Sequence, residues 1–224
     1  MPMTRARVVP VLVLMLGGAA ALVMSSCNIG VPAAYILHGP PKIQAVTELD
    51  EDRSTVIFID DPMNLVPRRA LRTQIGQAAE RHILEKKLVS SSKLVSTISI
   101  MRAASGGGEL SEDQPSVVDL GRRVGAEVVV YIQVTKFTLS NEPSHLSPVA
   151  GGVLKVIDTV ENKRLFPEDV GGYPFGFDLP DRTDQTSLSP AERNQWERSL
   201  ADEFGRGIAQ LFYTHERDPM STRR

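Results

Sequence analysis

The chain has 224 residues, of which 42% are hydrophobic and 23% are charged, and its formal net charge is -2. This composition supports one domain-sized hydrophobic core. The near-neutral charge gives no sign of the basic surface that a nucleic acid would need. An aromatic content of 5% argues against a surface that binds sugars or stacks on bases. The single cysteine excludes a disulfide within the chain, so the fold has to depend on its core alone.

The N-terminal segment has the three parts of a secretory signal. Two arginines precede an almost wholly apolar run over 8–23, and two serines then precede the lone Cys27. Small residues followed by a cysteine resemble the lipobox of bacterial lipoproteins, although Met24 stands where that family usually has leucine. The resemblance implies a signal peptide over 1–26 and acyl chains on Cys27, which would anchor the protein in a membrane without a spanning helix.

Two other interpretations of this segment stay open. An uncleaved signal anchor would need roughly 20 apolar residues to span a membrane, whereas 8–23 is shorter and contains Pro10 and two glycines. An ordinary secretory signal explains the apolar run but not the position of Cys27. Asn28 is not the aspartate that retains lipoproteins at the inner membrane of enteric bacteria. The resemblance therefore favours the outer membrane, with the protein facing the periplasm.

The first half of the mature chain begins with a tether and continues with alternating strands and helices. Residues 27–53 are rich in proline and end in an acidic run, which predicts a lipidated tether. The run 55–59 is β-branched and aromatic without alternation, which predicts a strand buried on both faces. A helix is expected to begin near Pro67, and 93–100 predicts a second strand. The helix carries apolar residues at every fourth position: Leu71, Ile75, Ala79 and Ile83.

The central part of the chain predicts a short helix, a long strand and a hairpin. The helix is expected over 115–125, where the terminal glycine suits a left-handed cap. The run 127–137 is the strongest strand signal in the chain. The strands 152–158 and 164–166 are separated by a turn in which Asn162 tolerates a positive φ, so they are expected to form a β-hairpin.

The C-terminal part predicts one long helix. Residues 173–177 fit an edge strand or a packed loop, and 215–224 reads as a disordered polar tail. Ser189, Pro190 and Glu192 form a capping signal at the start of the helix. The predicted fold is a single α/β domain over 54–214, with a mixed sheet of about five strands and helices packed on it, behind the lipidated tether.

Three local features resemble the fold shared by the TolB amino-terminal domain, the curli-secretion lipoprotein and the lipoprotein activators of penicillin-binding proteins. The passage 120–130 is similar to the family's helix-Gly-Ala-Asp-strand passage, and 153–159 is similar to its strand before a hairpin turn. The third feature is the opening strand with a helix soon after it. The resemblance covers roughly 55–213 and implies the fold. The loops are too short and polar for the amphipathic hairpins of a barrel, so no channel activity is carried over.

The titratable residues form no catalytic or metal-binding pattern in the sequence. Asp60 and Asp61 are adjacent in an extended segment and point to opposite sides, so only one of them can face a given site. Because Pro62 follows, the pair is expected to terminate a strand. The four histidines lack the spacing of a zinc site, and His82 on the apolar side of a helix is expected to be a core residue. No nucleophile elbow or dinucleotide glycine motif occurs. We therefore expect no enzymatic activity, no metal and no cofactor.

The expected function is that of a lipid-anchored, non-catalytic binding or assembly module on the periplasmic side of a membrane. Its partner would be an envelope protein that contacts the exposed rim of the sheet, and self-association stays open. Two alternatives are a regulator of a peptidoglycan synthase and an accessory component of an outer-membrane secretion complex without pore activity. The candidate partner-binding residues are Phe137, Asn141, His145 and Asn162.

Overall fold

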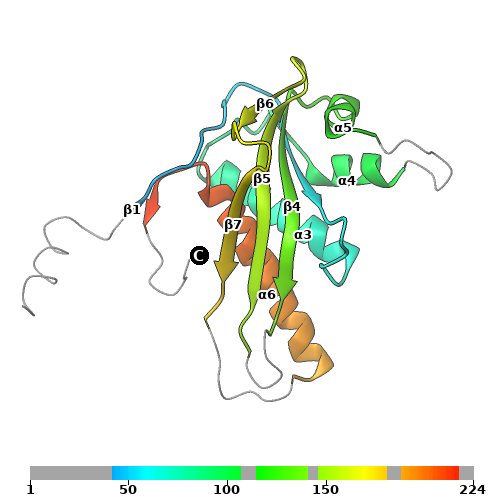
Figure 1. Ribbon diagram of the computed structural model, residues 1–224, viewed down its shortest axis with the longest axis vertical. Coiled ribbons are helices and arrows are strands. Elements are labelled where there is room, and N and C mark those ends of the chain that lie inside the picture. The colour runs from blue at the N-terminus through cyan, green and yellow to red at the C-terminus, as the bar shows by residue number, and fades with distance from the viewer. Residues whose placement is uncertain (1–41, 107–114, 141–145, 181–187, 217–224) are drawn as a thin grey trace, which may run out of the picture. The chain divides into compact units, whose positions relative to one another are not determined.

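Figure 1 shows the computed structural model, which describes residues 42–106, 115–140, 146–180 and 188–216. The chain divides into two units after Lys42, and the second unit, Ile43–Arg224, holds the α/β domain. The expected signal peptide and Cys27 lie outside the described residues. The elements in chain order are β1 (Lys42–Ile43), β2 (Thr55–Asp60), α3 (Arg69–Glu85), β3 (Leu94–Val95), α4 (Thr97–Ser105), α5 (Val117–Arg123), β4 (Val128–Thr138), β5 (Val149–Asp158), β6 (Lys163–Phe166), β7 (Tyr173–Asp178), α6 (Pro190–Gln210) and β8 (His215–Glu216).

The centre of the domain is a mixed sheet of six strands in the order β3-β2-β4-β5-β6, with β7 also paired to β5. The strands β3 and β4 run parallel to β2, whereas β5 is antiparallel to β4 and to both β6 and β7. The predicted α/β class and mixed sheet are confirmed, with six strands where about five were expected. The hairpin is also confirmed, and Asn162 in its turn has a φ of 53°.

Two apolar layers hold the helices on the sheet. The larger layer lies between α3, α6 and one face of the sheet, and it includes Ile57, Ile132 and Phe204. The smaller layer lies under α4 and α5 on the other face, where Val56 and Leu120 are buried. The strand β2 contributes to both layers, as expected for a continuous apolar run.

The helices α3 and α6 approach each other closely at Gly205. A Cβ at this position would lie 2.4 Å from the Ile75 carbonyl oxygen and 2.6 Å from the Ala78 Cβ. The predicted capping box of α6 is present, because Ser189 accepts a hydrogen bond from the Glu192 N–H while the Glu192 side chain accepts one from the Ser189 N–H. This cap fixes the start of the helix that packs on β5, β7 and α3.

The strand expected over 93–100 is wrong in its second half. Only Leu94–Val95 is extended, and α4 begins at Thr97, because the Ser96 side chain accepts a hydrogen bond from the Ile98 N–H and caps a helix. The apolar residues that resemble an alternating strand lie on different sides of the helix. Ile100 is fully buried whereas Ile98 is 41% exposed.

The residues that precede β2 pack against the domain. Val46 and Leu49 contact the larger apolar layer, and the Val46 N–H donates to the Leu211 carbonyl oxygen at 2.8 Å. At the other end of the domain, His215 and Glu216 form the short strand β8. Residues on both flanks of the sequence-predicted domain therefore take part in ordered contacts.

Candidate functional site on the uncovered face of the sheet

The structure describes two of the four residues that the sequence proposed as partner contacts. Phe137 is only 8% exposed, and its ring belongs to the larger apolar layer. Asn162 is exposed in the turn between β5 and β6. Asn141 and His145 lie outside the described residues.

Phe137 and Asn162 lie at opposite ends of the sheet. In the antiparallel pair of β4 and β5, Phe137 is opposite Ala150, whereas Asp158 near the turn is opposite Val128. The ten residues of β5 separate the two ends, which corresponds to about 30 Å of extended chain. Figure 1 shows the β5–β6 hairpin at one end of these strands and the C-terminal end of β4 at the other. The two residues therefore cannot contribute to one small contact area.

A different surface, which we call the open face, is the side of β4, β5 and β7 that faces away from α3 and α6. In Figure 1 these three strands lie in front of α3 and α6, and α4 and α5 lie beside them. The helices α4 and α5 pack on β2 and β4. Within the described ranges, no helix therefore covers β5 and β7 on this side. Its side chains include Tyr131, Gln133, Thr135, Val153 and Lys155, all of which are partly or fully exposed.

Tyr131 is held in place at the border of the open face. Its hydroxyl donates to the Asp60 carboxylate at 2.7 Å, and its ring lies 5.9 Å from the ring of Phe58. On the other side, the Lys155 ammonium lies 6.0 Å from the centre of the Tyr131 ring, within reach of a cation–π contact. A partly exposed aromatic ring fixed on several sides is the kind of group that anchors protein interfaces.

The pKa of Tyr131 lies well above its ordinary value. Burial raises it first, and the hydrogen bond to Asp60 and the negative charge of that carboxylate raise it further. Tyr131 is therefore a neutral phenol at physiological pH. Its hydroxyl donates to Asp60, so the open face presents a neutral phenol ring beside the Lys155 ammonium group rather than a reactive phenolate.

The adjacent Asp60 and Asp61 point to opposite sides, as the sequence predicted. Asp60 accepts the hydroxyl of Tyr131, whereas buried Asp61 accepts the N–H groups of Leu65 and Val66 at 2.8 and 2.9 Å. Asp61 thus ends the strand by organising the following turn. The contact of Asp60 with Tyr131 was missed from the sequence, since it depends on the pairing of β2 with β4.

The connection between β6 and β7 bounds the open face on one side. Gly172 has a φ of 89°, and a Cβ there would lie 2.4 Å from the Val153 Cγ1 and 3.0 Å from the Lys155 Cε. The connection therefore packs directly against β5. Its close approach requires glycine both for the backbone angle and for space.

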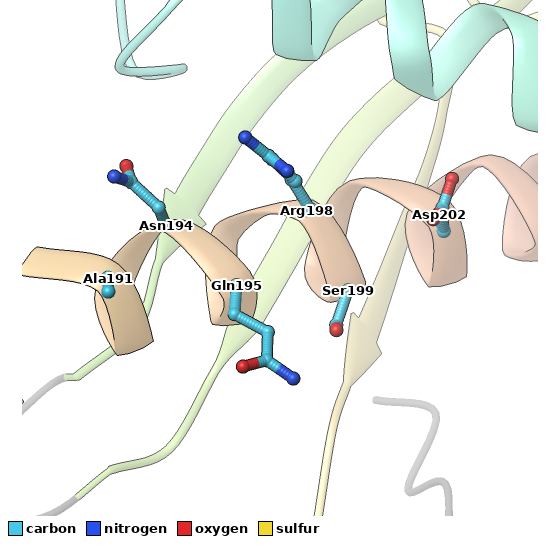
Figure 2. A pocket seen from close by; sticks show the side chains of 6 residues that line it. All are labelled: Ala191, Asn194, Gln195, Arg198, Ser199 and Asp202. Atoms are coloured by element: carbon cyan, nitrogen blue, oxygen red, sulfur yellow. The ribbon is translucent and has the colours of Figure 1, made fainter.

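A hollow on the exposed side of α6 is less suitable as a binding site than the open face. It has a volume of about 500 Å³ and is lined by Ala191, Asn194, Gln195, Arg198, Ser199 and Asp202. Figure 2 shows that all six belong to one helix, with Asn194 and Arg198 on one side and Gln195 and Ser199 on the other. Asp202 lies 3.6 Å from the guanidinium of Arg81. Side chains that diverge from one exposed helix stripe do not surround a ligand.

The described residues hold no cluster of three or more histidine, cysteine, aspartate or glutamate side chains suited to a metal ion. His82 differs from its expected place in the core, because its side chain is 25% exposed and its Nδ1 lies 3.0 Å from the Glu85 carboxylate. It lies in the last turn of α3, beside the boundary of the apolar stripe. Among the helices that the structure describes, none is both long and apolar enough to cross a membrane.

Among known proteins, the chain matches solved structures but no known sequence family. No family model matches the chain, and neither does any curated protein sequence. The chain is similar to PelC from Paraburkholderia phytofirmans, described as a dodecamer, at 10% identity over 77% of this chain and 96% of that chain, with a TM-score of 0.41. It is similar to the lipoprotein GNA1162 from Neisseria meningitidis at 11% identity over 68% of this chain and 99% of that chain, with a TM-score of 0.38.

A third similar structure is the C-terminal domain of LpoB from Salmonella enterica, at 12% identity over 51% of this chain and 79% of that chain, with a TM-score of 0.32.

Proposed function

We propose that this chain is a lipid-anchored protein of the bacterial cell envelope that acts as a non-catalytic binding or assembly module on the periplasmic side of a membrane. The lone Cys27 at the end of a signal-like segment supports the anchor. Removal of 1–26 would make Cys27 the first residue, and its acyl chains would hold the protein at the outer membrane. Each buried methylene of such chains contributes about 0.8 kcal/mol, so two or more chains give stable attachment.

The observation that carries the proposed binding role is the open face around Tyr131. The ring is oriented by Asp60 and flanked by Lys155, and Thr135, four residues further along β4, is exposed. Such a surface combines an aromatic anchor with polar groups that can form hydrogen bonds to a partner protein. The partner in this proposal is an envelope protein, and neither a metal nor a cofactor takes part.

A photo-crosslinking amino acid at Thr135 in the intact envelope tests the binding role. Thr135 lies on the open face without contacting the Tyr131 hydroxyl, so the replacement leaves the anchor ring in place. The matched control carries the same amino acid at Gln195, which is exposed on the outer side of α6. We expect one envelope protein to be captured from Thr135 and not from Gln195. Equal capture from both positions, or none from Thr135, would contradict the proposal.

A Cys27→Ser variant tests the anchor separately. We expect the variant to leave the membrane fraction once its signal peptide is removed, whereas the parent chain sediments with membranes. Membrane association of the processed variant would show that another part of the chain provides the attachment. Because this outcome is independent of capture at Thr135, the two parts of the proposal can fail separately.

A further inference from the structure

A β-bulge in β4 turns a second cation onto the open face. Val134 and Lys136 are opposite consecutive residues of β5, so Thr135 is an extra residue between them. Val134 and Phe137 both belong to the larger apolar layer. Regular alternation would point Lys136 toward the same layer as Val134, whereas the bulge lets Thr135 and Lys136 point together to the other side, where both are exposed.

The facing residues of β5 agree with this orientation. A Cβ at Gly152 would lie 3.4 Å from the Phe204 ring, so Gly152 faces α6. Its neighbour Gly151 faces the open side, because consecutive residues of a strand point to opposite faces. A Cβ at Gly151 would lie 3.7 Å from the Lys136 Cβ. The Lys136 side chain therefore leaves the sheet on the open face.

The two lysines of the open face are held at a fixed separation. Lys136 is opposite Gly151, and Lys155 is opposite Tyr131. The two positions are therefore four residues of β5 apart, which corresponds to about 13 Å along the sheet. Val153 lies midway between them and is partly exposed. The open face thus presents two cations on either side of an apolar side chain.

Within the described ranges, no carboxylate forms an ion pair with either of these lysines. The ion pairs of this part of the chain involve other cations. The Asp60 carboxylate accepts the hydroxyl of Tyr131 at 2.7 Å. Asp178 points to the open side because its neighbour Phe177 belongs to the larger apolar layer, and it already has an interaction partner. The positive charge of the two lysines is therefore left for a group outside the domain.

We propose that the open face binds an acidic segment of its envelope partner, with one carboxylate at Lys136 and a second at Lys155. This inference rests on the proposed binding role and adds the chemistry of the partner. Complementary charges steer the encounter of two proteins and fix the register of their interface. In an extended segment, carboxylates four residues apart match the separation of the two lysines. The residues between these carboxylates would contact Val153 and the ring of Tyr131.

The test uses the photo-crosslinking amino acid at Thr135, in the whole chain and in the envelope. One variant carries Lys136→Glu with Lys155→Glu, and a second carries Lys136→Arg with Lys155→Arg, which keeps both charges. The control carries Lys87→Glu with Arg193→Glu, at exposed positions beside α3 and on α6, and changes the net charge as much as the first variant. We expect the first variant to lower the yield of captured protein about tenfold, and the other two to retain it.

Mass spectrometry of the crosslinked product identifies the captured segment. We expect this segment to contain at least two acidic residues. Replacing them with lysine should restore capture by the variant with two glutamates, which would also show that this variant is folded.

The outcomes separate this inference from the binding role on which it rests. No capture by the chain that carries only the crosslinker would contradict the binding role itself. The acidic segment would be overturned by capture that survives the two glutamates, by an equal loss in the control, or by a lack of restoration with the lysine-substituted partner. A captured segment without acidic residues, or a lipid adduct in place of a protein, would overturn it as well.

Discussion

Arg53 and Asp158 form an ion pair of 2.9 Å between two segments that are 105 positions apart in the chain. The pair joins Arg53, two residues before β2, to the last residue of β5. Asp158 also accepts the N–H groups of Val160 and Glu161 at 2.8 and 2.9 Å, so its carboxylate organises the hairpin turn as well. The Asp158 side chain is only 5% exposed. A polar group that lost its hydrogen-bond partner here would therefore be shielded from water, which could not replace that partner.

Replacing this carboxylate should therefore destabilise the domain. Asp158→Asn keeps one oxygen for the turn but removes the negative charge opposite Arg53, and we expect a loss of about 2 kcal/mol in the free energy of unfolding. Urea unfolding followed by circular dichroism measures the change. Glu161→Gln is the matched control, because the pair of Glu161 with Lys163 is exposed to solvent and should contribute little to the free energy of unfolding. Equal losses from the two substitutions would contradict the assigned role of Asp158.

Two carboxylates at this end of the sheet should make the fold sensitive to acid. Hydrogen bonds from the Ser54 N–H and hydroxyl lower the pKa of Glu127. Burial raises the pKa of Asp158, but hydrogen bonds from the Glu161 N–H, Arg53 and the Val160 N–H outweigh it, so that this pKa is lowered as well.

A carboxyl group whose pKa is lower in the folded chain contributes stability above its unfolded pKa and loses it as the pH falls through the folded value. We therefore expect the free energy of unfolding to decrease once the pH drops below the ordinary carboxyl pKa of about 4. Urea titrations across this range measure the decrease. The decrease should be smaller in Asp158→Asn, and an unchanged acid dependence in that variant would count against the assignment.

The close contact of α6 with α3 predicts different costs for two glycines in the same helix. A Cβ at Gly205 would meet the backbone of α3 at 2.4 Å, whereas one at Gly207 would meet the Phe177 ring at 3.3 Å. Both substitutions to alanine gain about 1 kcal/mol of helix propensity. We expect Gly205→Ala to be destabilising by about 1–3 kcal/mol, because the helices have to move apart. Thermal unfolding compares the two, and similar midpoints would show that the helices separate at no cost.

Tyr131 should ionise well above the ordinary pKa of a tyrosine. Its pKa is raised in the fold, so the stability linked to its neutral form is present below the unfolded pKa of about 10 and is lost as the pH rises through the folded value. Absorbance of the phenolate, recorded during an alkaline titration of the parent chain and of Tyr131→Phe, separates this group from the other three tyrosines. The two curves should coincide near the ordinary tyrosine pKa. A difference of one phenolate in that range would show that Asp60 and burial do not hold the proton.

Local signals predicted most of the elements. The run at β2, the apolar stripe of α3 and the capping residues of α6 each combine a period with a start or stop signal, so the elements could be located from sequence. The start of α4 was not predicted, since Ser96 fits both a strand and a helix cap and its role depends on the surroundings. The contact of Tyr131 with Asp60 and the opposite positions of Phe137 and Asn162 depend on the order and register of strands, which no local pattern contains.

Gly76 gives α3 a contact with the other layer of the domain. A Cβ there would lie 2.3 Å from the Thr97 Cγ2 at the start of α4, and the buried Thr97 hydroxyl donates to the Ile57 carbonyl oxygen of β2. The neighbouring Ile75 and Ala78 meet α6 at Gly205. One turn of α3 thus sets the spacing to both α4 and α6, on the two sides of the sheet. Volume added at Gly76 and at Gly205 would displace the same turn, so their energetic effects should be coupled rather than additive.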